Sequence, residues 1–485
     1  MQKKLLRNSL LLAILFVATV VRLYRVHYPL LDWHSFRQAD TASVTREYVR
    51  SNLSQPLIPH YHDNSNIQSG KDNLEGYRMV EFPLVNIMVA AVMLGIPGLP
   101  LVITSRIFSI LFSLGTTTFL FLFARHYFSK KIAHLSALFF AVLPYSIFYS
   151  RAILPEPAML FFACGALYFF SCWLRTDKFY WYGISIVFFA LALLLKPFVA
   201  FYGFVFAILV WNRWQWRAFT KPLLYLYPLL SLAPFFWWRQ WIQQFPSGIP
   251  ASDWLFNGDK IRLRPAWFRW LGYERLTKLI LGYSGLPIFL AGLFPPKWRS
   301  HTPPLTFTIL IAWWVGLLLY AIVIATGNVR HDYYQVLWLP PLCLTLAQGV
   351  IVLDKFLTKK VSAQFSTLML TFLIIGMVSA SWYHTRGYFA VNHWEYVRAG
   401  EAVDQKVPAN AKMIAPAFGD TSFLFQTNRS GWPIGFEIEK KISLGATHYV
   451  TTSMDDEAKE LMERYKIIEQ TAEYVILDLT SPKAQ

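Results

Sequence analysis

The sequence VITSRIFSILFSLGTTTFLFLFA at residues 102–124 is the stretch that decides the fold. Arg106 is its only charged residue, and Arg125 follows it directly. An apolar run of about 20 residues matches the hydrocarbon thickness of a bilayer when it is helical. The whole chain is 55% hydrophobic and only 15% charged, which is more apolar than a soluble globular protein. The sequence therefore predicts a polytopic α-helical membrane protein.

Similar apolar runs on both sides of this stretch predict about eleven spans in total. The first, near 10–21, resembles a signal peptide, but no small-residue cleavage site closes it, so we expect it to remain as a span. The others lie near 132–150, 158–174, 179–195, 198–212, 222–241, 278–294, 304–325, 333–352 and 364–383.

The basic residues between the spans predict the orientation. With the N-terminus inside, every short inner segment is basic, as the positive-inside rule requires. These inner residues are Lys3, Lys4 and Arg7; Arg125, Lys130 and Lys131; Arg175 and Lys178; Arg213, Arg217 and Lys221; Lys297 and Arg299; and Lys355, Lys359 and Lys360.

The net charge of +17 is thus spread over the loops one at a time. Such scatter suits inner loops that face anionic lipid, and it argues against a nucleic-acid partner. The same orientation places 29–82, 243–277 and the chain after about 384 on the outer side of the cytoplasmic membrane.

The segment 83–98 is apolar but short, and prolines bound it at both ends. If it were a full span, every later loop would change sides and the positive charge would lie outside. We therefore expect an interfacial or re-entrant helix on the outer side, with two half-length helices as the alternative.

The C-terminal part of the chain differs in character from the spans. The stretch 447–451 is strand-like, and 455–465 has the pattern of a helix. Strands that alternate with helices predict a small α/β domain. We therefore divide the chain into a transmembrane domain over 1–383, with 29–82 as its first outer loop, and an extracytoplasmic domain over 384–485.

Two aspartates in the first outer loop are candidate acids. Asp40 precedes a weakly helical stretch, so it is either a helix N-cap or a general base at the membrane surface, and the two roles are compatible. Asp32 lies beside Trp33, and it is either a second candidate acid or an interface residue next to an aromatic anchor.

The end of the first loop adds further candidates. Glu81 comes immediately before the apolar segment 83–98, where a carboxylate is normally functional or paired, and Arg78 is its expected partner. His60 and His62 carry ligand-type side chains, but histidines in a solvated loop more often bind no metal. A divalent metal is thus an open alternative, and no cofactor is firmly predicted.

A second group of polar residues lies at the predicted outer ends of the spans. Glu156 is flanked by prolines in an outer corner, where a solvated turn is the plainer reading, and snorkelling is the plainer reading for Lys196. The remaining members are Arg151 and the run Arg330-His331-Asp332-Tyr333-Tyr334. Acids beside cations on one membrane face suit sugar transfer from an anionic lipid carrier, because a carboxylate can accept a proton while cations bind phosphate.

These residues resemble those of the polyprenyl-phosphate-dependent GT-C glycosyltransferases of family 39, which include protein O-mannosyltransferases and lipid A aminoarabinose transferases. The resemblance spans roughly 1–383, in the right order. Its motifs are Arg37-Gln38-Ala39-Asp40-Thr41-Ala42, Glu81-Phe82-Pro83-Leu84, Tyr149-Ser150-Arg151, Pro155-Glu156-Pro157, Lys196-Pro197 and His331-Asp332-Tyr333-Tyr334-Gln335 ahead of Leu339-Pro340-Pro341.

The resemblance implies roles for individual residues. Asp40 looks like the catalytic acid of the first loop, with Asp32 as its competitor, and Glu156 looks like the acid of the second outer loop. Glu81 resembles a residue that can contact a divalent metal. The family usually has lysine at the position of Phe82, so the donor phosphate-binding role passes to Lys196, Arg151, Arg330, His331 and Tyr334 as candidates.

We therefore expect a membrane glycosyltransferase that moves a sugar from a polyprenyl-phosphate carrier to a hydroxyl acceptor, which is a lipid, a protein or a glycan. The lipid bilayer is its other partner. The main alternative is a transporter or flippase for lipid-linked sugars, which would favour polar residues at mid-membrane and inverted repeats. The charges here lie at span ends, apart from Arg106, and the sequence shows no internal repeat. A structural partner without chemistry leaves the clustering unexplained.

Overall fold

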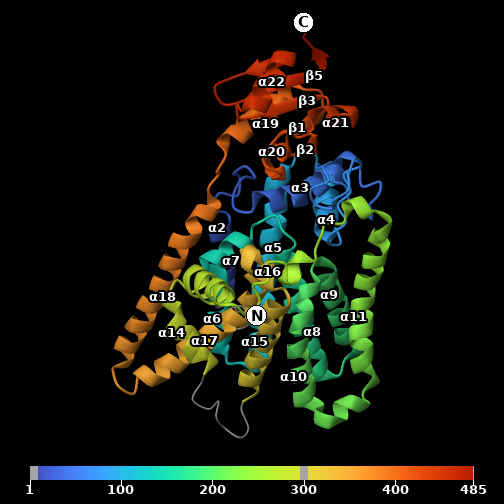
Figure 1. The fold of residues 1–485 in the computed structure, drawn as a ribbon. Coiled ribbons are helices and arrows are strands. Elements are labelled where there is room, and N and C mark those ends of the chain that lie inside the picture. The colour runs from blue at the N-terminus through green and yellow to red at the C-terminus, as the bar shows by residue number, and fades with distance from the viewer. Residues whose placement is uncertain (1–8, 295–303, 484–485) are drawn as a thin grey trace. The chain divides into compact units, whose positions relative to one another are not determined.

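The computed structural model describes residues 9–294 and 304–483 (Figure 1). The basic residues Lys3, Lys4, Arg7, Lys297 and Arg299 therefore lie outside the described residues. The chain forms two compact units, each built from separate segments. Unit 1 comprises 1–26, 109–239 and 252–387, and unit 2 comprises 27–108, 240–251 and 388–485.

Unit 1 is helical. Its elements are α2 (Ser9–Arg22), most of α5 (Leu101–Tyr127), α6 (Lys130–Val142), α7 (Pro144–Tyr149), α8 (Glu156–Thr176), α9 (Phe179–Leu195), η1 (Pro197–Tyr202), α10 (Gly203–Trp214), η2 (Gln215–Thr220), most of α11 (Pro222–Trp241), α12 (Trp254–Asn257), α13 (Pro265–Phe268), the π-helix η5 (Arg269–Ile280), α14 (Gly285–Leu293), α15 (Leu305–Val323), α16 (Ala325–Arg330), η6 (Asp332–Trp338), α17 (Leu339–Leu357) and α18 (Ala363–Thr385), which η7 (Arg386–Phe389) follows.

The prediction of a helical membrane protein is confirmed. Among the described residues, six helical segments are long and apolar enough to cross a bilayer. A seventh arises if the pair Pro265–Ile280 and Gly285–Leu293, bent by 118°, counts as one span. The count of eleven stays a prediction, because several expected spans are short or broken. Pro144 divides 132–150 into α6 and α7, and α9 has only 17 residues.

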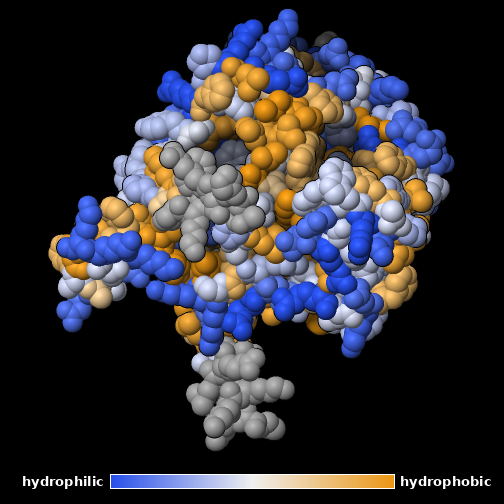
Figure 2. Space-filling model, turned by 90° about the horizontal axis from the view of Figure 1, so that it is seen from below, coloured by the Kyte–Doolittle hydropathy of each residue, from blue (hydrophilic) through white to orange (hydrophobic). Residues whose placement is uncertain are grey.

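Contacts between loops show which ends of the helices in unit 1 lie together. Lys131 lies 3.6 Å from Asp354, and Arg213 lies 2.6 Å from Asp177, so these four loops that are predicted to face inward meet in pairs. Glu156 begins the 21-residue helix α8 at the opposite end from Asp177. Figure 2 shows hydrophilic side chains in blue around hydrophobic ones in orange, seen from below. The pairing agrees with the loop parity that the positive-inside pattern predicts.

Unit 2 contains a small mixed sheet. Its elements are α3 (Ser35–Arg50), α4 (Leu84–Gly95), η3 (Ile242–Gln244), η4 (Pro246–Gly248), α19 (Trp394–Lys406), β1 (Lys412–Ile414), α20 (Thr421–Gln426), β2 (Ser430–Trp432), α21 (Ile438–Ser443), β3 (His448–Thr451), α22 (Asp456–Arg464), β4 (Tyr465–Gln470) and β5 (Val475–Pro482).

The sheet has the strand order β2-β1-β3-β5-β4, in which β1 pairs in parallel with β2 and β3, and β5 pairs antiparallel with β3 and β4. Successive side chains of a strand point to opposite faces. Met413 packs with α19 and α20 on one face, and Ile414 packs with α22 on the other. The C-terminal segment therefore forms a three-layer α/β/α fold, which confirms the predicted small α/β fold.

The first outer loop is joined to this sheet. The amide of Gly431 in β2 donates to the carbonyl oxygen of His62 at 2.9 Å, and the amide of Asn64 donates back to Gly431 at 2.7 Å. Gly431 has φ 153°, and a Cβ there would lie 1.8 Å from the Met413 carbonyl oxygen, so only glycine fits. Residues 27–108 belong to the same unit as the C-terminal segment, and the predicted division of the chain at 384 stays a prediction.

The segment 83–98 contains one short helix, α4, of 12 residues. The amide of Asn86 donates to the carbonyl oxygen of Thr41 at 2.7 Å and to the Thr45 hydroxyl at 3.0 Å, which holds α4 against α3. The structure thus has a single short helix where two half-length helices were the alternative. Its place at the membrane interface stays a prediction.

Candidate active site

Asp40 lies in the interior of α3 and is 1% exposed. The helix begins at Ser35 with His34 as its N-cap, so the N-cap alternative for Asp40 is wrong. The Oδ2 atom of Asp40 lies 2.9 Å from an Arg78 guanidinium nitrogen and accepts a hydrogen bond from Gln68 at 3.1 Å. Its Oδ1 atom accepts a hydrogen bond from the Thr421 hydroxyl at 2.7 Å.

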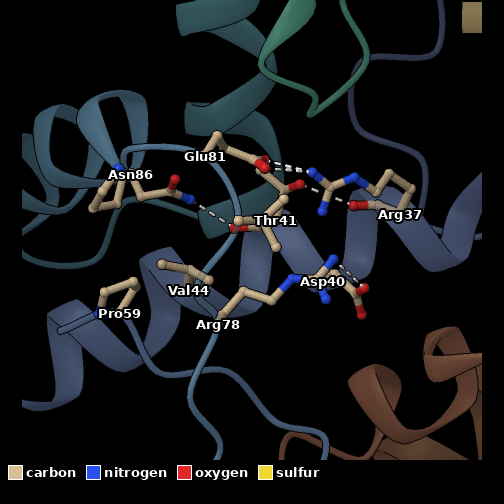
Figure 3. A pocket seen from close by; sticks show the side chains of 10 residues that line it. Arg37, Asp40, Thr41, Val44, Pro59, Arg78, Glu81 and Asn86 are labelled. Carbon is tan, nitrogen blue, oxygen red and sulfur yellow. Dashed lines mark hydrogen bonds and ion pairs between the residues drawn. The ribbon is translucent and has the colours of Figure 1, made fainter. Parts of the chain in front are cut away.

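Glu81 lies in the same pocket as Asp40 (Figure 3). Both of its carboxylate oxygens accept from one guanidinium nitrogen of Arg37, at 2.5 and 2.7 Å. The predicted partner of Glu81 was Arg78, and this was wrong: Arg78 turns to Asp40 and Gln68 instead. The pocket is lined by Arg37, Asp40, Thr41, Val44, Pro59, Arg78, Val80, Glu81, Pro83 and Asn86. Two acid–arginine pairs thus lie in one pocket of unit 2.

Asp32 has a different environment from Asp40. One of its oxygens accepts from Gln38 at 2.7 Å, and the other lies 3.0 Å from Arg106. Arg106 is fully buried, and it also donates to the carbonyl oxygen of Tyr28 at 2.5 Å. Asp32 does not line the pocket that contains Asp40. Asp32 therefore lies in a buried ion pair with Arg106, and Asp40 is the aspartate that lines the pocket.

Titratable side chains next to Asp40 have shifted pKa values. Burial raises the pKa of Asp63 to about 6, although the Ser65 amide stabilises its charged form. Burial lowers the pKa of His62 to about 4, with nearby Arg46 adding to the effect. Burial also raises the pKa of Asp420. At neutral pH the surroundings of Asp40 therefore contain a neutral imidazole and a carboxylate that is charged at a cost in folding energy.

The Asp63 shift predicts how one substitution depends on pH. A carboxyl whose pKa is raised by folding stabilises the folded state below its unfolded value near 3.8, and this contribution is lost as pH rises through about 6. Asp63→Asn removes that contribution. We expect its unfolding free energy, relative to the wild type, to be about 2 kcal/mol lower at pH 4 than at pH 7. Denaturation in detergent at both pH values measures the difference, and an equal offset at both would contradict the shift.

In unit 1, Glu156 and Lys196 form a close ion pair. Glu156 is the first residue of α8, and Lys196 is the C-cap residue of α9, where Pro197 ends the helix. The lysine Nζ atom lies 2.5 Å from a Glu156 oxygen, and Glu156 is only 1% exposed. The plainer readings, a solvated turn glutamate and a snorkelling lysine, are therefore both wrong. The Nζ atom also lies 5.0 Å from the ring centre of Tyr334.

Asp332, within the motif His331-Asp332-Tyr333-Tyr334-Gln335, is a buried acid that the sequence did not predict as a site residue. Its Oδ1 atom accepts from the Tyr149 hydroxyl at 2.6 Å, and its carbonyl oxygen accepts from the Tyr145 hydroxyl at 2.5 Å. Arg275, from the π-helix η5, lies 3.8 Å from its other oxygen. Nothing in the sequence around Arg275 signalled this pairing, since it arises from the long connection between α11 and α14. The acid is thus held in a fixed orientation at the start of η6.

The other candidate phosphate ligands are distributed differently. His331 stacks on Tyr333 with ring centres 5.2 Å apart, and Lys196 lies 5.0 Å from the same tyrosine ring, so both side chains pack against Tyr333. Arg330 points elsewhere: its side chain is 55% exposed and pairs with Asp259 at 2.5 Å. Arg151 is fully buried, with one nitrogen donating to the carbonyl oxygen of Arg25 at 3.2 Å, which suits a structural role.

The candidate metal ligands do not come together. Among the described residues, no group of three or more His, Cys, Asp or Glu side chains is arranged to hold a metal ion. His60 Nδ1 lies 2.8 Å from the carbonyl oxygen of Glu75, His62 Nε2 lies 2.9 Å from that of Thr421, and Glu81 is paired with Arg37. The residues present do not fit a metal centre, and no step of the chemistry below depends on one.

The chain is similar in fold to solved membrane glycosyltransferases. ArnT from Cupriavidus metallidurans, in a crystal structure with undecaprenyl phosphate, matches with a TM-score of 0.66 and 12% identity, over 97% of this chain and 98% of that one. Its apo structure matches with a TM-score of 0.64 and 13% identity, over the same shares of the two chains. The oligosaccharyltransferase AglB from Archaeoglobus fulgidus matches with a TM-score of 0.58 and 10% identity, over 93% of this chain and 70% of that one. No curated protein matches the chain by sequence.

The fold is therefore similar to that of these membrane glycosyltransferases. Residues 83–241 match the family model described as dolichyl-phosphate-mannose-protein mannosyltransferase, in agreement with the resemblance to glycosyltransferase family 39. The matched part contains Glu156 and Lys196 and ends within α11. The first outer loop with Asp40 lies before it.

Proposed function

We propose that this chain transfers a sugar from a polyprenyl monophosphate carrier to a hydroxyl acceptor on the outer face of the cytoplasmic membrane. The observation that carries the proposal is the buried Asp40 carboxylate, held by Arg78 in the wall of a pocket. The fold shared with ArnT, which was solved with undecaprenyl phosphate, supports a carrier of that chemical class.

In the proposed reaction, the acceptor oxygen attacks the anomeric carbon of the sugar. The bond from that carbon to the phosphate oxygen breaks, and the polyprenyl phosphate leaves with the electron pair. Asp40 accepts the proton of the acceptor hydroxyl, which typically contributes about 10²–10⁴-fold to such a rate. Arg78 pairs with the carboxylate and fixes its orientation. Inversion at the anomeric carbon follows from the resemblance to the family.

Lys196 is the proposed phosphate ligand. A lysine ammonium binds phosphate as a compact positive charge, and the ion pair with Glu156 fixes the position of this one. His331 and Tyr334 pack around the same lysine and belong to the proposed phosphate site. We do not assign Arg330 or Arg151 to it, because the contacts of these two residues lead elsewhere.

The proposed topology has eleven spans, with the N-terminus inside and the sheet of unit 2 outside. It rests on the basic residues of the short loops, two pairs of which are in contact at one end of unit 1. With this orientation Asp40, Glu156 and Lys196 are all on the outer side, where a carrier-linked sugar and an outer-leaflet hydroxyl acceptor are available.

The experiment is a transfer assay in proteoliposomes with a polyprenyl-phosphate sugar that is labelled in the sugar. A glycosyltransferase releases polyprenyl phosphate and moves the label to a hydroxyl acceptor. A flippase moves the intact donor across the bilayer, which the accessibility of the labelled sugar to a membrane-impermeant oxidant reports. Translocation of uncleaved donor, with no release of polyprenyl phosphate across a panel of lipid, peptide and glycan acceptors, would contradict the proposal.

A further inference from the structure

The C-terminal segment of unit 2 reaches Asp40 directly. Thr421, the first residue of α20, is 2% exposed, and its hydroxyl lies 2.7 Å from Asp40 Oδ1. The same hydroxyl lies 3.2 Å from the carbonyl oxygen of Phe36, one turn earlier on α3. The hydroxyl has one proton to donate, so it faces two acceptors and the carboxylate is the closer one.

The position of Thr421 is fixed from several sides. Its carbonyl oxygen lies 2.9 Å from His62 Nε2, in the first outer loop. Further along α20, Arg46 of α3 donates to the carbonyl oxygen of Phe425 at 3.2 Å, and its guanidinium lies 5.0 Å from the ring centre of the same residue. The α20 helix is therefore attached to the helix that carries Asp40, and the threonine hydroxyl has little freedom to move away.

We propose that Thr421 is a positioning residue for the acid of the transfer reaction, and that the C-terminal α/β segment is therefore part of the active site. The proposal rests on the proposed role of Asp40. With Arg78 and Gln68 on Oδ2, the Thr421 hydroxyl is the group that fixes the second oxygen. Oδ1 is then the oxygen that receives the acceptor's proton.

The second hydrogen-bond acceptor gives Thr421 a place to turn. When an acceptor hydroxyl donates to Asp40 Oδ1, the threonine hydroxyl can rotate toward the Phe36 carbonyl oxygen, 3.2 Å away. In the resting state it donates to the carboxylate and so fixes the orientation of Oδ1. Thr421 thus orients the base in the resting state and leaves Asp40 Oδ1 free to accept from the substrate hydroxyl when it binds.

The test compares Thr421→Val, which keeps the branched shape but removes the hydroxyl, with Thr421→Ser, which keeps the hydroxyl. Thr427→Val is the matched control, because Thr427 is also buried and its hydroxyl donates only within α20, to the Leu424 carbonyl oxygen at 2.7 Å. We expect Thr421→Val to lower kcat about tenfold with little change in KM for the donor, Thr421→Ser to recover most of kcat, and the control to stay near wild type.

The pH profile separates positioning from a purely structural role. Loss of a hydrogen bond to the carboxylate raises its pKa, so the acidic limb of kcat should move to higher pH in Thr421→Val and return in Thr421→Ser. The charged and titratable groups around Asp40 are Arg78, His62, Asp63, Asp420 and Tyr61, together with Arg37 and Glu81 in the same pocket. All of them remain in both variants. A difference between Thr421→Val and Thr421→Ser in the acidic limb of kcat therefore reports the loss of the hydroxyl.

The outcomes distinguish this inference from the function on which it rests. If Asp40→Asn loses transfer but Thr421→Val keeps wild-type kcat and an unshifted acidic limb, the positioning role is wrong and the proposed function stands. If Asp40→Asn transfers sugar normally, the proposed role of Asp40 fails first. If Thr421→Ser and Thr427→Val lose as much activity as Thr421→Val, packing of α20 is what matters, and the inference is overturned.

Discussion

Replacing Asp40 with asparagine is expected to lower the rate of sugar transfer about 10³-fold, within the range that a positioned general base contributes. Asparagine has the same shape and can still accept from the Thr421 hydroxyl, but it cannot take the acceptor's proton. Donor binding should change little, because the proposed phosphate ligand is Lys196. The measurement is kcat and KM for a labelled polyprenyl-phosphate sugar in proteoliposomes.

Asp32→Asn is the matched comparison. The substitution removes the carboxylate that lies 3.0 Å from the fully buried Arg106. Breaking a buried ion pair from one side costs about 3–5 kcal/mol, so this variant should lose folded protein and thermal stability. The fraction that folds should keep most of its turnover. A folded Asp32→Asn protein with turnover reduced 10³-fold, beside an active Asp40→Asn, would reverse the assignment of the two aspartates.

Local chemistry made much of this site predictable. The positive-inside rule, which counts only lysine and arginine in the short loops, predicted that one side of the membrane holds the acids, cations and tyrosines at the span ends. Glu156 and Lys196 come from different helices, and they do form a pair. Because α8 and α9 are consecutive helices that pack together, the start of the first lies beside the end of the second, and this proximity follows from the order of the spans.

Partner choice inside the first loop was not predictable in the same way. Arg78 is three residues from Glu81 and was expected to pair with it, but the chain between them does not form a helix that would bring the two side chains together. Arg37 reaches Glu81 from α3, and Arg78 is left for Asp40. Sequence distance is a poor guide to pairing where the backbone is irregular.

Thr421 illustrates a second limit. It lies 381 residues from Asp40, in a segment whose pattern indicates only a small α/β fold. A threonine at the start of a helix is ordinarily an unremarkable cap or turn residue. Its role depends on the first outer loop and the sheet folding as one unit, which the exchange of backbone hydrogen bonds with Gly431 shows and no local motif encodes.

Lys196→Met is expected to lower kcat/KM for the donor about 100-fold, the effect of losing a charge-assisted hydrogen bond to phosphate. Methionine keeps the length and apolar stem of the lysine, so its packing against the tyrosine rings of η6 is retained. The substitution also leaves the Glu156 carboxylate, which is 1% exposed, without the ammonium that lies 2.5 Å away. Part of the loss then comes from a destabilised fold. A second variant is needed that removes this loss of stability.

The double variant Lys196→Met/Glu156→Gln separates stability from phosphate binding. Removing both charges of a buried pair is often neutral for stability, whereas removing one is costly. We expect the double variant to regain the thermal stability that Lys196→Met loses, but not its donor kcat/KM, because the phosphate ligand is still absent. Glu156→Gln alone keeps the ammonium but removes its anionic partner, so donor kcat/KM should fall less than in Lys196→Met. If the double variant recovers transfer together with stability, the ion pair only holds α8 to α9, and the phosphate must be bound by another cation.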